Sequence, residues 1–295
     1  MTQILADSLI YAAEIGIIAM GVALCFAILR FANFAHVQFA VVGAYLTYSA
    51  NRFLGLPLVP ATLLSAVATG LLAVGIDRAV FARLRRITPE GKMIVSWGVA
   101  LILRAAIACC FGGASRVFPV EPAALNALGA YFTSQDVAVV AATLAAILAL
   151  HLLLHRTRAG TALRALASNA ELAETRGIPA ERMIALMWLI SAGFAAIGGT
   201  LFALETRLQP NMDLIILLPT FSAVTIGGLD RVFGAAIGAL VLSLAQNLLI
   251  GVDLGGLLGL GSWSVPTRFR DFIAVGAMVL ILLLRRRTPG ALAAR

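Results

Sequence analysis

The sequence predicts an all-α polytopic membrane protein that forms a single transmembrane domain over residues 1–295. Three observations support this fold class: 61% of the residues are hydrophobic, only 12% are charged, and the mean hydropathy is +0.99. A soluble domain has about 45–50% apolar and about 25% charged residues, so this chain is too apolar to cover itself with a polar surface. Backbone groups in hydrocarbon must be satisfied within their own segment, which favours helices as the spanning form.

A membrane-spanning helix needs about 20 mostly apolar residues, within a range of about 17–25. About nine segments of the sequence approach this requirement. In chain order, the expected spans are residues 9–29, 33–53, 60–82, 93–112, 135–155, 183–204, 213–227, 232–250 and 271–285. The seventh is short and holds Pro219. We expect it to cross as a tilted or broken helix, because a re-entrant segment would place the arginines at 285–287 outside.

The loops between these segments set the expected orientation. With the N-terminus outside, most of the 22 Lys and Arg residues fall inside, chiefly in the 83–92 loop, the 156–182 loop and the tail from residue 285. Cytoplasmic loops are enriched in these residues. We therefore predict a periplasmic N-terminus, a cytoplasmic C-terminus and a multi-pass protein of the bacterial inner membrane. The same pattern explains the net charge of +8 without nucleic-acid binding.

Residues 156–182 form the longest polar segment between two apolar runs. Residues 162–176 are rich in Ala, Leu, Glu and Arg, which favour helix, and Gly177 followed by Pro179 supplies a stop signal. Asn169 could instead cap a second, shorter helix. A charged, helix-forming cytoplasmic loop is typical of a contact with another protein, although an amphipathic helix lying on anionic lipid would have a similar composition.

Several polar residues lie inside the apolar segments, and we expect them to line a substrate pathway. They are Glu14, Asn33, His36, Gln38 and Arg104. A charge at the bilayer centre costs about 2.5–3.5 kcal/mol, so such groups face the protein interior or water. Asn33 could instead cap its helix, with His36 and Gln38 at the membrane interface. An ion pair between Glu14 and Arg104 is one arrangement that would neutralise both charges.

Four glycines are predicted to serve helix packing. Gly227 and Gly228 permit a tight turn between the seventh and eighth segments. Gly234 and Gly238 have the GxxxG spacing that lets another helix backbone approach closely. These features indicate packing and carry little information about function.

The sequence lacks the common motifs of nucleotide-binding and hydrolytic sites. No GxxxxGK[ST] motif is present, so the chain has no Walker-type ATP site of its own, and neither HExxH nor GxSxG occurs. His151 and His155 have a spacing that could ligate a metal, but a position at the cytoplasmic interface is the favoured interpretation. We therefore predict no catalytic residues, no metal and no cofactor.

Three motifs together resemble the permease subunits of branched-chain amino-acid ABC importers, a family that also includes urea and amide permeases. Residues 33–45, NFAHVQFAVVGAY, resemble its NFAHGEF-like segment. Residues 164–178, RALASNAELAETRGI, are similar to its RA-A-N---A---GI loop, and residues 227–238, GGLDRVFGAAIG, to its GGLGS--GA--GG stretch. The motifs occur in the family's order, and the resemblance covers nearly the whole chain.

The sequence departs from the family pattern at two places. Val37 and Gln38 stand where the family usually has Gly and an acidic residue, and Asp230 and Arg231 stand where it usually has Gly-Ser. The first departure removes a carboxylate near the expected pathway, which would fit a solute of different charge. The second alters a predicted cytoplasmic turn.

The resemblance implies a permease subunit that translocates a small solute, a branched-chain or other amino acid or a related amide, from periplasm to cytoplasm. Its implied partners are two cytoplasmic ABC ATPase subunits, a second related permease subunit and a periplasmic solute-binding protein. ATP hydrolysis would occur on the ATPases, so this chain would be no enzyme. The 156–182 loop would couple to them through Arg164, Glu171, Ala173, Arg176 and Gly177.

Two other classes of function remain open from the residues alone. A stand-alone secondary transporter or channel would use Glu14 and Arg104 as coupling groups deep in the membrane. An intramembrane enzyme would need a nucleophile and a base; His36 and Ser96 are available, but no known spacing links them. A neighbouring gene for an ATPase with a Walker motif would favour the ABC importer.

Overall fold

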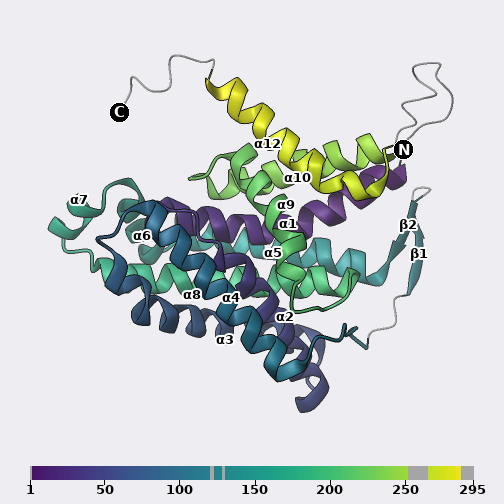
Figure 1. The fold of residues 1–295 in the computed structure, drawn as a ribbon, viewed down its shortest axis with the longest axis horizontal. Helices are drawn as coiled ribbons and strands as arrows, with labels where there is room; N and C mark the ends of the chain where they lie inside the picture. The colour runs from purple at the N-terminus through teal and green to yellow at the C-terminus, as the bar shows by residue number, and fades with distance from the viewer. Residues whose placement is uncertain (1, 120–122, 128–129, 252–264, 287–295) are drawn as a thin grey trace.

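The computed structural model describes residues 2–119, 123–127, 130–251 and 265–286, which contain eleven α-helices (Figure 1). Every segment predicted to span the membrane coincides with one of them. These nine helices are α1 (Thr2–Leu29), α2 (Ala35–Leu54), α3 (Leu58–Ala79), α4 (Pro89–Phe111), α5 (Ser134–Arg156), α8 (Ala180–Glu205), α9 (Met212–Gly227), α10 (Val232–Gly251) and α12 (Arg270–Arg286). The remaining two, α6 (Arg158–Ser168) and α7 (Ala170–Thr175), lie within the predicted polar loop.

Six of the described helices are long and apolar enough to cross a membrane: α1, α3, α4, α5, α8 and α10. Helix α9 is apolar but has only 16 residues, α12 has 17, and α2 carries several polar side chains. A helical, polytopic fold is therefore confirmed, whereas nine crossings and their orientation stay predictions. Arg287 and Arg295 of the predicted cytoplasmic tail lie outside the described residues.

A small β-hairpin interrupts the helical pattern, and the sequence analysis did not predict it. Strand β1 (Ala124–Ala127) pairs antiparallel with β2 (Ala130–Thr133) between α4 and α5. The Gln3 side chain fastens the hairpin to the start of α1, accepting from the Tyr131 N–H at 2.9 Å and donating to the Tyr131 carbonyl at 3.3 Å. Thr133 and Asp136 then form a capping box that begins α5.

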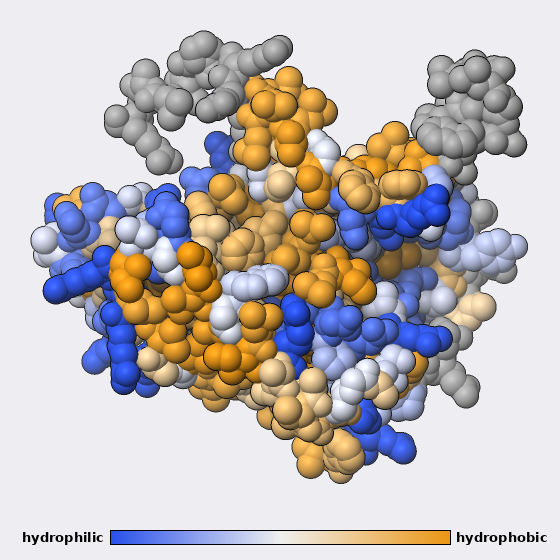
Figure 2. Space-filling view, in the orientation of Figure 1, coloured by the Kyte–Doolittle hydropathy of each residue, from blue (hydrophilic) through white to orange (hydrophobic). Residues whose placement is uncertain are grey.

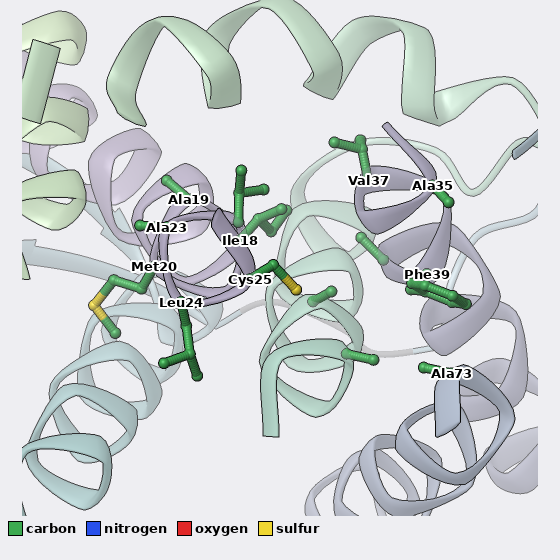
Figure 3. Close-up of a cluster of buried hydrophobic side chains, with 14 of the residues drawn as sticks. Ile18, Ala19, Met20, Ala23, Leu24, Cys25, Ala35, Val37, Phe39 and Ala73 are labelled. Carbon is green, nitrogen blue, oxygen red and sulfur yellow. The ribbon is translucent and has the colours of Figure 1, made fainter. Parts of the chain in front are cut away.

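Helix α1 is the centre of the bundle. It contacts α5, α8, α9 and α10, and most of its length is buried because these helices surround it. Figure 3 shows side chains of α1, α2 and α3 in one buried cluster, among them Ile18, Cys25, Phe39 and Ala73.

Helices α2 and α8 cross with their backbones in contact. A Cβ added to Gly199 would lie 2.1 Å from the Ala40 carbonyl oxygen, and one added to Gly43 would lie 2.2 Å from the Ala196 Cβ. Small residues permit this approach between membrane helices. The hydroxyls of Thr47 on α2 and Thr200 on α8 also form a hydrogen bond of 2.9 Å, which adds a polar contact at the crossing.

The four predicted packing glycines lie at the turn from α9 to α10. A Cβ on Gly227 would lie 1.9 Å from the Gly234 carbonyl oxygen, and one on Gly238 would lie 2.1 Å from the Ala223 carbonyl oxygen. Gly228 has φ +105, a conformation that favours glycine. The two helices therefore approach too closely for larger residues at these positions.

The molecule has two distinct ends. Helices α6 and α7 lie at one end of the bundle, and the N-terminus and the β-hairpin lie at the other (Figure 1). Between them, Figure 2 shows a broad apolar surface, with hydrophilic side chains gathered at the end that holds α6 and α7 and again toward the end that holds the β-hairpin. Large apolar residues on α3, α4, α5, α10 and α12 are exposed, as expected for helices whose outer faces meet lipid.

Candidate functional site

A polar cluster joins helices α2, α4 and α9. Asp213, in the first turn of α9, accepts a hydrogen bond from the Arg104 guanidinium of α4, and the two form an ion pair. The Gln38 amide of α2, oriented with its nitrogen toward the carboxylate, donates to Asp213 at 3.0 and 3.2 Å. The Asp213 side chain is 6% exposed and that of Arg104 is 22% exposed. The cluster is therefore largely desolvated but open on one side.

The hypothesis of a Glu14–Arg104 ion pair is wrong, because the partner of Arg104 is Asp213. The sequence analysis missed Asp213, which lies at the boundary of the seventh predicted segment. Its position offered a signal, since a carboxylate in the first turn of a helix is stabilised by the helix dipole. Choosing it over Glu14 requires knowing how three helices separated in the sequence cross one another.

His36 lies on the opposite side of α2 from Gln38. Two residues that are two positions apart on a helix point in directions that differ by about 200° around its axis. The His36 ring is fully buried, with its Nδ1 3.8 Å from the Cys25 Sγ, and that thiol donates to the Ser191 Oγ at 3.1 Å. A Cβ on Gly21 would lie 2.6 Å from the His36 Nε2. His36 therefore packs between α1 and α8, and only Gln38 joins Arg104.

Asn33 acts at the break between α1 and α2. Its Oδ1 accepts from the Ala35 N–H at 3.1 Å, and its carbonyl oxygen accepts from the His36 N–H at 3.2 Å. The Ser96 hydroxyl of α4 accepts from the Phe34 N–H at 3.0 Å. The N-cap of α2 is Phe34, which makes no side-chain cap, so the prediction that Asn33 caps this helix is wrong; the Asn33 side chain instead holds the turn that leads into α2. Backbone groups also occupy the Ser96 hydroxyl, so the structure offers no support for a His36–Ser96 nucleophile and base.

Glu14 faces a second polar region, a cavity of about 560 Å³ near the β-hairpin. Asp136 of α5, Glu205 at the end of α8 and Arg270 at the start of α12 also line it. Glu14 is 3% exposed, and its Oε1 has no hydrogen-bond partner among the described residues. The Arg270 guanidinium carbon lies 3.8 Å from the centre of the Tyr11 ring. The sequence analysis did not predict that these groups meet.

A neighbouring cavity of about 640 Å³ extends this region toward α9. Both cavities are lined by Phe202, Glu205, Thr206 and Ile215. The neighbouring cavity also includes Met212, which directly precedes Asp213. The two cavities therefore run from Glu14 to the vicinity of the Gln38–Arg104–Asp213 cluster.

The predicted coupling loop consists of two short helices separated by a cap. Of the two predicted arrangements, one helix or two, the structure has two. Asn169 is the N-cap of α7, and its Oδ1 accepts from the Leu172 N–H at 3.0 Å. Gly177 has φ +82 and donates to the Glu174 carbonyl at 2.9 Å, and the Ile178 N–H reaches the Ala173 carbonyl at 3.1 Å. These bonds terminate α7 in the left-handed manner that glycine permits.

The predicted contact residues of this loop differ in exposure. Ala173 is buried against the bundle, whereas the others point to solvent: Arg164, Glu171, Arg176 and Gly177. Leu172, which the sequence analysis did not single out, is 56% exposed at the tip. An exposed leucine surrounded by charged residues is the signal that could have identified it.

The His151 and His155 rings stack with centroids 4.4 Å apart. The described part of the chain contains no group of three or more His, Cys, Asp or Glu residues that could hold a metal ion. The pair contacts the Phe233 ring instead.

Comparisons with known proteins agree on one family. Residues 4–283 match the family model described as branched-chain amino acid transport system / permease component. The chain is 25% identical to the high-affinity branched-chain amino acid transport system permease protein BraD of Pseudomonas aeruginosa, over 96% of this chain and 93% of BraD. It is 27% identical to the probable branched-chain amino acid transport permease protein LivH of Methanocaldococcus jannaschii, over 84% of this chain and 80% of that protein. It is 24% identical to Escherichia coli LivH, over 90% of this chain and 88% of that protein.

Proposed function

Because this chain belongs to the family of branched-chain amino-acid transport permease components, we propose that it forms the membrane path of an ATP-driven importer and moves a small solute from periplasm to cytoplasm. It is a multi-pass membrane protein and a transport subunit, and ATP hydrolysis belongs to a separate component. Relatives are named as permeases for branched-chain amino acids. The proposed solute is therefore a branched-chain or other amino acid, or a related amide.

The observation that carries this proposal is the exposed α6–α7 unit at one end of the bundle. Leu172 offers an apolar anchor, and Glu171 and Arg176 provide a charged rim, the arrangement typical of a protein contact. The caps at Asn169 and Gly177 hold this surface in one conformation. We assign it to docking of an ABC ATPase subunit, which places this end of the molecule in the cytoplasm.

Close helix contacts provide a route from this unit to the polar cluster. Helix α6 rests on α5, since a Cβ on Gly160 would lie 2.1 Å from the Leu153 carbonyl oxygen. Helix α7 leads directly into α8, whose Gly199 touches the backbone of α2. Because α2 carries Gln38, a rigid shift of α8 would reach the Gln38–Asp213–Arg104 cluster. ATP binding would bias the bundle between two packed arrangements.

The proposed assembly contains two ATPase subunits, a second related permease and a periplasmic solute-binding protein. The binding protein would deliver the solute at the end that holds the β-hairpin. Helix α9 exposes Leu214, Ile215 and Leu218 close to the partly open Arg104–Asp213 pair. A charged pair facing lipid is costly, so we assign this face to the second permease, which would enclose the path.

Substitution Leu172→Asp tests the docking surface. Because the side chain is exposed, the variant should fold and insert normally but lose co-purification with the ATPase and ATP-driven uptake. Leu54→Asp is a matched control: Leu54 is 66% exposed at the end of α2, and its variant should retain the ATPase. Equal ATPase recovery with Leu172→Asp would contradict the assignment. Uptake by the permease alone, without ATP, would support a secondary transporter.

A further inference from the structure

The cavity beside the β-hairpin has a charge opposite to that of the chain. The protein carries a net charge of +8, yet one arginine and five acidic residues line this cavity. They are Arg270 and Asp7, Glu14, Asp136, Glu205 and Asp271. Clefts lined by one sign of charge concentrate ligands of the opposite sign. The cavity is therefore suited to a cationic group.

Glu14 is the part of this cavity that lacks a partner. The residue is 3% exposed, and its Oε1 accepts no hydrogen bond from any described residue. A buried carboxyl group without a partner either stays uncharged or is stabilised by a donor that reaches it. The open cavity in front of it provides room for a ligand that would supply the missing donor.

Arg270 does not supply that donor. Its guanidinium stacks on the Tyr11 ring and donates to the Asn247 Oδ1 at 3.3 Å. No ion pair within 4 Å joins Arg270 to Glu14 in the described part of the chain. Arg270 therefore lowers the local negative charge without occupying the Glu14 carboxylate.

The neighbouring carboxylates leave space for a compact donor. One oxygen of Asp136 accepts from the Thr133 N–H at 2.6 Å as part of the α5 cap, and Glu205 is exposed at the rim. Among the described residues, no three such groups lie close enough to hold a metal ion. The Glu205 and Asp136 carboxyl groups lie within hydrogen-bond reach of each other, and an ammonium group, with three donors, can bind such a pair together with Glu14.

We propose that Glu14, with Glu205 and Asp136, forms a binding subsite for the primary ammonium group of the transported solute. This inference rests on the proposed function and adds where the permease recognises the amine. The cavity volume of about 560 Å³ lies within the range of small-molecule sites, about 300–1,000 Å³. In the neighbouring cavity, Arg207 offers a cation for a carboxylate at the other end of the solute.

Binding to the full-length permease in nanodiscs tests the subsite without any ATPase. The probes are L-leucine, 3-methylbutylamine, which lacks the carboxylate, and 4-methylpentanoate, which lacks the amine. The lipids are phosphatidylglycerol and phosphatidylcholine, so no lipid supplies a primary ammonium. Titration calorimetry should detect both amines, and Glu14→Gln should weaken each by about tenfold or more, as expected for loss of a charge-assisted hydrogen bond.

Two further variants separate recognition from folding. Glu14→Asp keeps the charge and should restore part of the amine affinity, whereas Glu90→Gln removes one exposed acidic group outside the cavity and should change it less than about twofold. Equal binding of 3-methylbutylamine by wild type and Glu14→Gln would overturn the proposal, as would a loss of 4-methylpentanoate binding in Glu14→Gln as large as the loss of amine binding. Because ATPase co-purification with Glu14→Gln reports docking separately, failure of this subsite is distinguishable from failure of the proposed function.

Discussion

Neutralising Asp213 tests the ion pair that joins α4 to α9. Asp213→Asn keeps the side-chain shape but leaves the Arg104 guanidinium without a counter-charge. Removing one partner of a fully buried ion pair costs about 3–5 kcal/mol. Because the Arg104 side chain is 22% exposed, solvent screens part of this loss, and we expect a destabilisation of about 2–3 kcal/mol.

The reverse substitution and the double variant complete the cycle. Arg104→Gln leaves the Asp213 carboxylate, 6% exposed, with the Gln38 amide as its remaining side-chain donor among the described residues, so its cost should be at least as large. The double variant removes both charges and should lose less than the sum of the single variants, by about 1–2 kcal/mol for residues in direct contact. The expected order of stability is therefore wild type, either single variant, then the double variant, whose loss is smaller than the sum of the two single losses.

Thermal unfolding in one detergent at a fixed scan rate measures this order, followed by tryptophan fluorescence. Asp77→Asn is the comparison: Arg85 pairs with Asp77 at 3.2 Å but also with Glu181 at 2.8 Å. Because that arginine keeps a second carboxylate, its variant should lose less stability than Asp213→Asn. Strictly additive losses in the Arg104/Asp213 double variant would refute the reasoning, since they would mean that the two charges do not interact.

Three further substitutions test the packing and the coupling loop. Gly199→Ala should destabilise the bundle by about 1–3 kcal/mol, since the new Cβ would lie 2.1 Å from a backbone oxygen. In the control variant Gly75→Ala the new Cβ meets no atom within 4 Å, and the protein should gain up to about 1 kcal/mol of stability. Equal melting points of the two variants would contradict the close crossing of α2 and α8. Gly177→Pro should abolish ATP-driven uptake without preventing insertion, because proline cannot adopt the φ of +82 found at Gly177. The control variant Gly55→Pro, at another left-handed helix end, should retain ATPase binding. Unchanged uptake by Gly177→Pro would count against coupling through the 156–182 loop. Asn169→Ala should cost about 1 kcal/mol of local stability because it removes the side-chain cap of α7. Amide hydrogen exchange should then become faster in α7 and stay the same in the other helices. Unchanged exchange in α7 would show that packing, and not the cap, holds this helix.

The helices could be predicted well because their signal is local. Each predicted span coincides with a helix, from residues 9–29 in α1 to residues 271–285 in α12. Helical backbone bonds close within four residues, so a run of apolar residues is sufficient to indicate them. The cap at Asn169 was also visible in the sequence as an alternative, since capping depends on neighbours two or three residues away.

The candidate site was only partly predictable. Gln38 and Arg104 were expected in the pathway, and the structure joins them through Asp213. Glu14 was also expected in the pathway, with an ion pair to Arg104 as one arrangement, but the structure places it in the cavity with Glu205 and Asp136. The β-hairpin was missed because its strands have four residues each, too few for a clear alternating pattern.

Hydropathy, caps and family motifs are properties of short segments, so the sequence was sufficient to predict a helical membrane permease with a polar loop. The pairing of Arg104 with Asp213 and the position of Glu14 at an acidic cavity became visible in the three-dimensional structure alone. Such partners could not be predicted because they depend on how helices cross and rotate. That crossing is set by contacts such as Gly199 against Ala40, between residues far apart in the chain.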